Sequence, residues 1–230
     1  MTNWNVVFED HFLGETLNRD KWRTLYRWGR NNPTNQELQR FDDNAHIVAN
    51  SILHLEAREE TKEGYDYQSG MIATWDNFYQ EYGRFEIRCK FPLGKGFWPC
   101  FWLLPQSPPE GQESVPEIDV AEFEGSSDWQ MFGNFHWLDV TKQKESFTMS
   151  QANWAQSWHT YLCEWSPTVA IYYADGWEYG RHTTPMMTNG PMYLIAGLTI
   201  GGLPWPGYPD ENTTFPAYFD IDYIRVYTST

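Results

Sequence analysis

Apolar and polar residues alternate along several stretches of the chain, which is the pattern of half-buried β-strands. In residues 52–58, Leu53, Leu55 and Ala57 alternate with polar side chains. Residues 84–91 follow the same period, with Phe, Ile and Cys on one face and charged side chains on the other. Because successive side chains of a strand point to opposite faces, each stretch predicts a strand with one buried face.

Other stretches extend this β-rich pattern. Residues 192–200, MYLIAGLTI, are apolar on both faces and predict a central strand covered on both sides. Residues 169–180 predict a hairpin with Asp175-Gly176 at its turn. Helical patterns are scarce, and the one short helical turn that we expect lies in residues 150–159, capped by Ser150. Many short strands without βαβ alternation predict an all-β sandwich of two antiparallel sheets.

The stretch PEIDVAEFEG, residues 116–125, begins with the polar–apolar alternation of a strand, and this alternation then breaks. Glu117 and Asp119 fall on one face, whereas Glu122 falls one position too late to join them. A β-bulge inserts one extra residue into a strand and would return Glu122 to that face. The sequence therefore predicts three carboxyl groups on one surface.

Two carboxyl groups so placed would suit a retaining glycosidase, in which they stand about 5–5.5 Å apart. One of Glu117 and Glu122 would attack the anomeric carbon and the other would protonate the leaving oxygen. Two like charges at this distance favour one protonated group, as a general acid requires, and Asp119 between them could hydrogen-bond the nucleophile. The alternatives are a solvated acidic face or a calcium site. Apolar neighbours anchor the stretch in a core, and this favours a site.

Composition narrows the choice of partner. The chain has 16 Lys and Arg against 31 Asp and Glu, a formal net charge of −15. This charge argues against nucleic acid, whose phosphates need a basic surface, and against anionic membranes. Aromatic residues make up 18% of the chain; most would fill the core, and a minority could stack on sugar rings in a groove. We expect one domain spanning residues 1–230.

The three cysteines form no close-spaced motif, and their odd number leaves at least one without an intramolecular partner. We interpret Cys89, Cys100 and Cys163 as buried thiols. The first ten residues lack the basic start and apolar run of a signal peptide, and no segment approaches the roughly 18 apolar residues of a membrane span.

The acidic stretch resembles the signature of glycoside hydrolase family 16, in the form with one additional residue before the second Glu. The resemblance extends over nearly the whole chain, in the expected order. It is carried by VFEDHF, LNRDKW, NQELQRF, SGMIATWDNFYQEYGRFEIRCKFPLGKGFWPCFWLLP, FHW, WHTYLCEW, GGLPWPGYPDENTTFP and FDIDYIRVY. It implies a concanavalin-like β-jelly-roll with a substrate cleft on its concave face.

The resemblance also implies roles for single residues. Glu117 would be the nucleophile, Asp119 its partner, Glu122 the acid/base, and His136 a neighbour that tunes the acid/base by hydrogen bonding. Substrate binding would fall to Asn35 and Glu37, which by alternation share a strand face with Gln39, and to three tryptophans of the groove: Trp98, Trp102 and Trp205.

No cofactor is required for this chemistry, but many similar proteins hold a structural Ca²⁺ on the convex side. Asp222 resembles the family aspartate near that site, and Glu9 could supply a second carboxylate. His11 stands where relatives commonly carry a carboxylate that could have served the ion.

The expected function is a retaining endo-β-glucanase acting on mixed-linkage β-1,3-1,4-glucan, on β-1,3-glucan, or on both. The alternatives are a galactan hydrolase of the agarase, porphyranase or carrageenase type, and a non-catalytic glucan-binding lectin. Sulfated galactans call for a basic groove, which this composition disfavours. We expect a monomer that acts outside the cytoplasm, extracellular or periplasmic, because the polymer cannot enter a cell.

Overall fold

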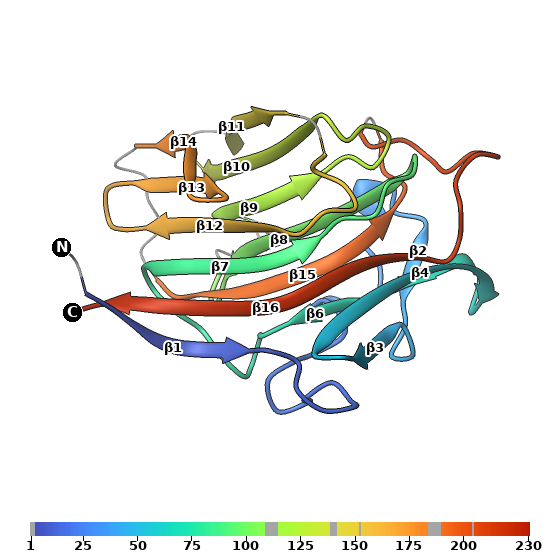
Figure 1. Ribbon diagram of the computed structural model, residues 1–230, viewed down its shortest axis with the longest axis horizontal. Coiled ribbons are helices and arrows are strands. Elements are labelled where there is room, and N and C mark those ends of the chain that lie inside the picture. Colours follow the sequence, from blue (N-terminus) through green and yellow to red (C-terminus); the bar gives the residue numbers. More distant parts are fainter. Residues whose placement is uncertain (1–2, 109–114, 139–141, 152, 184–189, 204) are drawn as a thin grey trace.

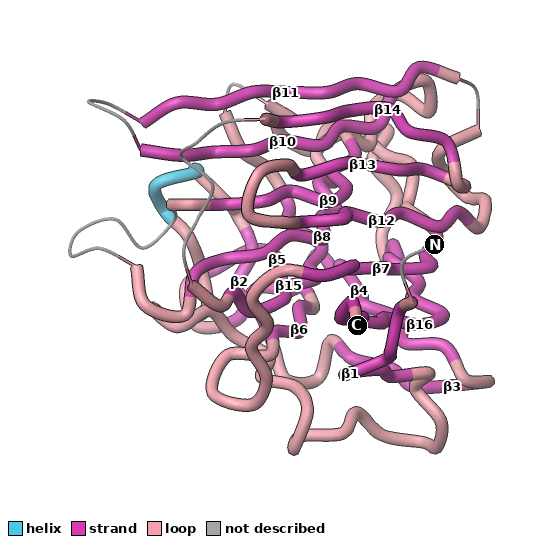
Figure 2. The backbone as a smooth tube through the Cα atoms, turned by 90° about the vertical axis from the view of Figure 1, so that its left-hand side faces the viewer, coloured by secondary structure: helices cyan, strands magenta, loops and turns pink. Residues whose placement is uncertain are grey.

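The computed structural model describes residues 3–108, 115–138, 142–151, 153–183, 190–203 and 205–230. Their strands form two sheets, which lie one over the other in Figure 1 and are seen from the side in Figure 2. The six-stranded sheet has the order β11 (Lys142–Ser150), β10 (Gln130–Leu138), β9 (Glu117–Phe123), β8 (Phe97–Pro105), β15 (Met192–Ile200), β6 (Met71–Ala73).

The ten-stranded sheet follows the order β14 (Trp177–His182), β13 (Ala170–Ala174), β12 (His159–Trp165), β7 (Gly83–Lys90), β16 (Ala217–Ser229), β4 (Ile52–Lys62), β5 (Tyr65–Ser69), β2 (Gln39–Phe41). In the same sheet, β1 (Trp4–Asp10) pairs with β16 and β3 (His46–Ala49) with β4. The one helical element among the described residues is the 3-10 turn η1 (Pro33–Asn35). All strand pairs described are antiparallel except β2 with β5, which confirms the predicted sandwich.

The main core lies between the two sheets and is made by the apolar faces of their strands. In β4 and β7 every second residue is buried over the alternating stretches, as predicted. Ile87 of β7 and Ile118 of β9 belong to the same apolar cluster, although they come from different sheets. Burying an aliphatic or aromatic side chain stabilises the fold by about 1.5–3 kcal/mol, so this cluster holds the sheets together.

The strand β15 is buried at every position, as predicted for a central strand covered on both sides. Leu194, Ala196 and Leu198 face the main core. Tyr193 and Ile195 face the other way, into a second cluster with Phe41. Segments from the first part of the chain therefore cover part of the outer face of the six-stranded sheet.

The predicted hairpin is confirmed, since β13 and β14 pair across Asp175 and Gly176. Both turn residues have positive φ angles, 49° and 82°, which glycine and aspartate tolerate better than most residues.

The predicted helical turn in residues 150–159 is wrong. Ser150 is the last residue of β11, and Asn153 and Gln156 have positive φ angles of 70° and 60°, outside the helical region. Trp154 is fully buried, and the backbone N–H of Gln156 donates to the carbonyl of Phe91 rather than within a helix. Packing of Trp154 into the core therefore outweighs the weak helical pattern.

Candidate active site

A β-bulge interrupts β9 where the sequence predicted it. On the β8 side the register skips Val120, and on the β10 side it shifts between Asp119 and Glu122. Val120 and the residue after it both belong to the main core. The extra residue returns Glu122 to the face of Glu117 and Asp119, so the prediction of three carboxyls on one surface is confirmed.

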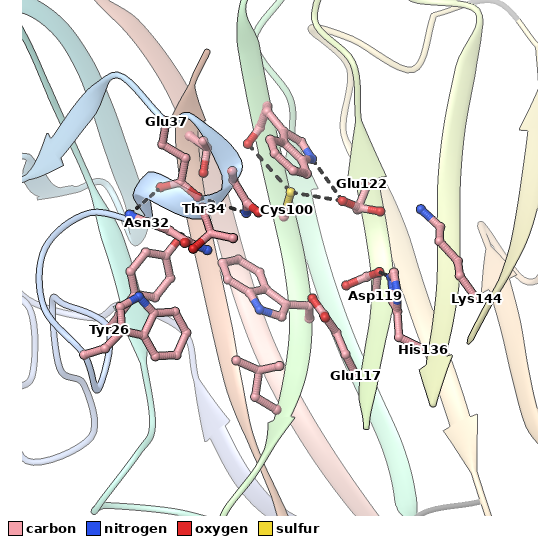
Figure 3. A pocket seen from close by; sticks show the side chains of 16 residues that line it. Tyr26, Asn32, Thr34, Glu37, Cys100, Glu117, Asp119, Glu122, His136 and Lys144 are labelled. Carbon is pink, nitrogen blue, oxygen red and sulfur yellow. Dashed lines mark hydrogen bonds and ion pairs between the residues drawn. The ribbon is translucent and has the colours of Figure 1, made fainter. Parts of the chain in front are cut away.

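These carboxyls line a cleft of about 550 Å³ on the outer face of the six-stranded sheet. Figure 3 shows Glu37 and Tyr26 on one side of β9, and His136 and Lys144 on the other. The lining residues are Tyr26, Trp28, Asn32, Thr34, Asn35, Glu37, Trp98, Cys100, Trp102, Leu104, Glu117, Asp119, Glu122, His136, Lys144 and Thr199. The acidic stretch is therefore not a solvated strand face, because it forms part of a cleft.

Glu122 is almost fully buried and is held by neighbours on both adjacent strands. The indole Nε1 of Trp98 donates to Glu122 Oε1 at 3.0 Å, and the thiol of Cys100 approaches the same oxygen at 3.7 Å. The amide of Asn134 donates to Oε2, and its own carbonyl accepts a hydrogen bond of 2.7 Å from Ser146. The carboxyl group is therefore fixed in orientation by three donors.

Burial, followed by the charge of Asp119, raises the pKa of Glu122 to about 8. The charges of Lys144 and His136 and the hydrogen bond from Trp98 act in the opposite direction, but they do not cancel the effect of burial. Glu122 therefore carries a proton at neutral pH, which is the state that a general acid needs.

Asp119 and His136 form a pair beside Glu117. His136 Nε2 lies 3.0 Å from Asp119 Oδ2, and both side chains are largely shielded from solvent. One side-chain polar atom from each of Glu117, Asp119 and His136 lies within 4.8 Å of the other two. The bond of His136 Nε2 is to Asp119 because His136 stands opposite Glu117 in the register, four residues from Phe132, the partner of Glu122. His136 acts on Glu122 through its charge.

Glu37 is a third buried carboxyl in the cleft, on the side formed by the first part of the chain. It accepts hydrogen bonds from Gln39 Nε2 at 2.8 Å and from Asn35 Nδ2 at 3.3 Å. Burial raises its pKa to about 7. Asn35 and Glu37 therefore both line the cleft, but Asn35 belongs to η1 and does not share a strand face with Gln39.

Gln39 ties this part of the cleft to the six-stranded sheet. Its side-chain oxygen accepts a hydrogen bond of 2.8 Å from the backbone N–H of Ile200, at the end of β15. The backbone N–H of Leu38 donates to the carbonyl of Ile200 at 2.8 Å. The two residues that follow Glu37, Leu38 and Gln39, therefore hold it over the six-stranded sheet.

The three tryptophans predicted to bind substrate differ in their settings. Trp98 and Trp102 both line the cleft, although Trp102 is only 9% exposed and packs in the second apolar cluster. Trp205 lies beside Trp98 with its ring edge-on at 5.2 Å, and also contacts Phe132 at 5.5 Å. Trp98 and Trp205 thus form one aromatic pair, and Trp98 connects this pair to Glu122.

Sequence reasoning missed several residues of the cleft, and it missed Asn134, which contacts Glu122. Trp28 is 42% exposed and stacks on Tyr26 at 4.6 Å with an interplanar angle of 14°. No sequence pattern marks these two or Lys144. By contrast, alternation could have found Cys100, which falls two residues from Trp98 in β8, and Asn134, which falls two residues from His136 in β10.

The proposed calcium ligands Glu9 and Asp222 each lie next to an arginine. Glu9 lies 3.7 Å from Arg225, and Asp222 forms an ion pair with Arg88. Carboxylates that pair with arginine fit a cation site poorly, and calcium binding here stays a prediction. All three cysteines are free and buried, which confirms their interpretation.

Comparison with known proteins gives a consistent picture. The model of glycosyl hydrolases family 16 matches residues 32–225. The laminarinase from Rhodothermus marinus has the same jelly-roll fold, with a TM-score of 0.88 and 29% identity over 100% of this chain and 99% of that one. A beta-glucanase of Rhodothermus marinus is 32% identical, over 98% of this chain and 85% of its own length. The endo-1,3-1,4-beta-glycanase ExsH of Rhizobium meliloti is 33% identical over 80% of this chain, but over only 40% of its own length.

Proposed function

Because the chain belongs to glycosyl hydrolases family 16, we propose that it is a retaining endo-β-glucanase that cuts internal bonds of β-1,3-glucan or mixed-linkage β-1,3-1,4-glucan. The observation that carries the proposal is the bulge of β9, which places Glu117, Asp119 and Glu122 on one face of a cleft. Two glutamates in such a pair are the machinery of double displacement at an anomeric carbon.

In the first step, a Glu117 oxygen bonds to the anomeric carbon while the bond to the leaving sugar breaks, and Glu122 gives its proton to the leaving oxygen. In the second step, Glu122 takes a proton from water, the water oxygen bonds to the anomeric carbon, and the ester to Glu117 breaks. Each step inverts the anomeric carbon, so the product keeps the original configuration. Asp119 and His136 lie next to Glu117 and are 3.0 Å from each other. This pair orients the Glu117 carboxylate for its attack on the anomeric carbon.

The charges of the cleft support a neutral polymer as the substrate. Four carboxyl residues line it, against Lys144 and His136 as the basic residues among those that line it. Aromatic faces suited to sugar rings are supplied by Trp28, stacked on Tyr26, and by Trp98. A sulfated galactan calls for a more basic lining than Lys144 and His136 provide, so a galactan hydrolase is the second choice.

The test is release of reducing ends from barley β-glucan, lichenan, laminarin, agarose, κ-carrageenan and carboxymethylcellulose. We expect release from laminarin, from the mixed-linkage glucans, or from both. Release only from the galactans would replace the glucanase by a galactan hydrolase. Binding to glucans without release from any polymer would identify a lectin.

The stereochemistry of hydrolysis is a separate prediction. We expect the β-anomer to appear first in a proton NMR time course with an active glucan, followed by mutarotation, since two inversions retain configuration. If the α-anomer appeared first, Glu117 would act on a water molecule and not as a nucleophile.

A polysaccharide substrate also bears on where the protein works. None of the helices in the described part of the chain is both long and apolar enough to cross a membrane. We expect an extracellular or periplasmic location because the polymer lies outside the cell, and we expect a monomer, which size-exclusion chromatography would test.

A further inference from the structure

Cys100 is a buried thiol that lies directly across from Glu122. The two residues are register partners on the neighbouring strands β8 and β9. Alternation along β8 places Cys100 on the same face as Trp98 and Trp102, and all three line the cleft. Figure 3 shows the sulfur atom between Glu122 and the side formed by Glu37. This thiol therefore belongs to the site, unlike Cys89 and Cys163, which belong to the main core.

The donors around Glu122 divide unevenly between its two oxygens. Oε1 is approached by Trp98 Nε1 at 3.0 Å and by Cys100 Sγ at 3.7 Å. Oε2 receives one donor among the described residues, the amide of Asn134. Each carboxylate oxygen offers about two lone-pair positions. Two donors thus reach the two positions of Oε1, and one position of Oε2 is left for a proton.

The thiol hydrogen has two acceptors at equal distance. Cys100 Sγ lies 3.7 Å from the carbonyl oxygen of Trp98 and 3.7 Å from Glu122 Oε1. A negative charge on Glu122 attracts a donor more strongly than a neutral carbonyl does. The S–H group should therefore turn to Oε1 once Glu122 has given its proton away.

The thiol keeps its hydrogen at working pH. Burial, then the charges of Glu122, Asp119 and Glu37, raises the pKa of Cys100 well above its ordinary value. The titratable groups that face Glu122 come from four strands: Glu117 and Asp119 of its own strand, Cys100 of β8, His136 of β10 and Lys144 of β11. Among them, Cys100 is the neutral donor in hydrogen-bond contact with the carboxyl.

We propose that Cys100 is a positioning residue for Glu122: once Glu122 is ionised, the Cys100 thiol and the Trp98 indole fill both acceptor positions of Oε1, so that the proton is recovered through Oε2. The inference rests on the proposed function, in which Glu122 is the acid/base. It also explains why a polar thiol stands between two tryptophans on the cleft face of β8.

The test compares Cys100→Ala, which removes the donor, with Cys100→Ser, which keeps one. We expect kcat of Cys100→Ala to fall about 3- to 10-fold. The alkaline limb of its kcat/KM profile should move up by about half a pH unit, because the ionised Glu122 carboxylate loses a hydrogen-bond donor. Cys100→Ser should keep the wild-type limb. Cys163→Ala is the matched control, a buried thiol outside the cleft, and its limb should not move.

A carbon-13 NMR titration of the Glu122 carboxyl in the Glu117→Gln background gives a second readout that needs no turnover. We expect its midpoint to rise with Cys100→Ala and to stay in place with Cys100→Ser. The role of Cys100 would be overturned if Cys100→Ala and Cys100→Ser had the same titration midpoint and the same pH profile as each other. A wild-type protein inactive on every polymer would instead overturn the proposed function, while the titration would still report on the thiol.

Discussion

Glu117→Gln is expected to lower kcat on the active glucan by at least about 10³-fold, because an amide cannot form the covalent intermediate. Glu117 and Gln have the same shape, and Glu117 lies at the edge of β9 on the cleft side, outside the main core. The thermal midpoint and the affinity for an oligosaccharide of the active glucan should therefore stay close to wild type. Initial rates, a thermal melt and calorimetric titration measure the three quantities.

The matched control for this variant is Glu178→Gln. Glu178 is exposed on β14, where it pairs with Arg181, and it does not line the cleft. Its kcat should equal that of the wild type. Substantial hydrolysis by Glu117→Gln, with this control normal, would show that another group attacks the anomeric carbon.

Glu122→Gln is expected to abolish polymer hydrolysis and, at alkaline pH, to make the protein more stable than wild type. Burial and Asp119 raise the pKa of Glu122 from 4.5 to about 8, so between these values the folded state binds more protons than the unfolded state. The free energy of unfolding therefore falls as pH rises through this window. At about 1.4 kcal/mol per pKa unit, the loss amounts to several kcal/mol.

An uncharged glutamine removes this loss. We expect the free energy of unfolding of Glu122→Gln to exceed that of wild type at pH 9 by a few kcal/mol, with a much smaller difference at pH 4.5. Urea unfolding at both pH values measures the difference. Glu37 keeps a similar but smaller pH dependence in both proteins, because its pKa is raised to about 7. Parallel pH profiles for wild type and Glu122→Gln would contradict the raised pKa.

Much of the sheet structure could be predicted from the sequence because it depends on local alternation. The strand β4 was indicated by the alternation of Leu53, Leu55 and Ala57 with polar residues. The bulge was indicated by Glu122, which falls one position out of the alternation of Glu117 and Asp119. These features follow from the period of a strand and from the need to bury apolar side chains. Such rules act over a few residues and can be read without knowing what lies across the sheet.

The partners across the sheet could not be predicted in this way. The hydrogen bond of His136 to Asp119, the contact of Cys100 with Glu122 and the approach of Lys144 all depend on the register of neighbouring strands. The burial of Trp154, which replaces the expected helical turn, depends on the core that receives it. These side-chain partners and the burial of Trp154 are determined by contacts between residues far apart in the chain. Such contacts leave only a weak pattern in a single sequence.

The two sides of the cleft are built from separate stretches of the chain. Tyr26, Trp28 and Glu37 come from the first part, tied to β15 through Gln39, whereas the reacting carboxyls stand on β9. This arrangement is modular. Under the proposed function, exchanging residues 26–41 with those of a relative would change the sugar selectivity and leave the carboxyl groups of β9 in place. Selectivity and bond cleavage would then be two separately evolvable traits within one groove.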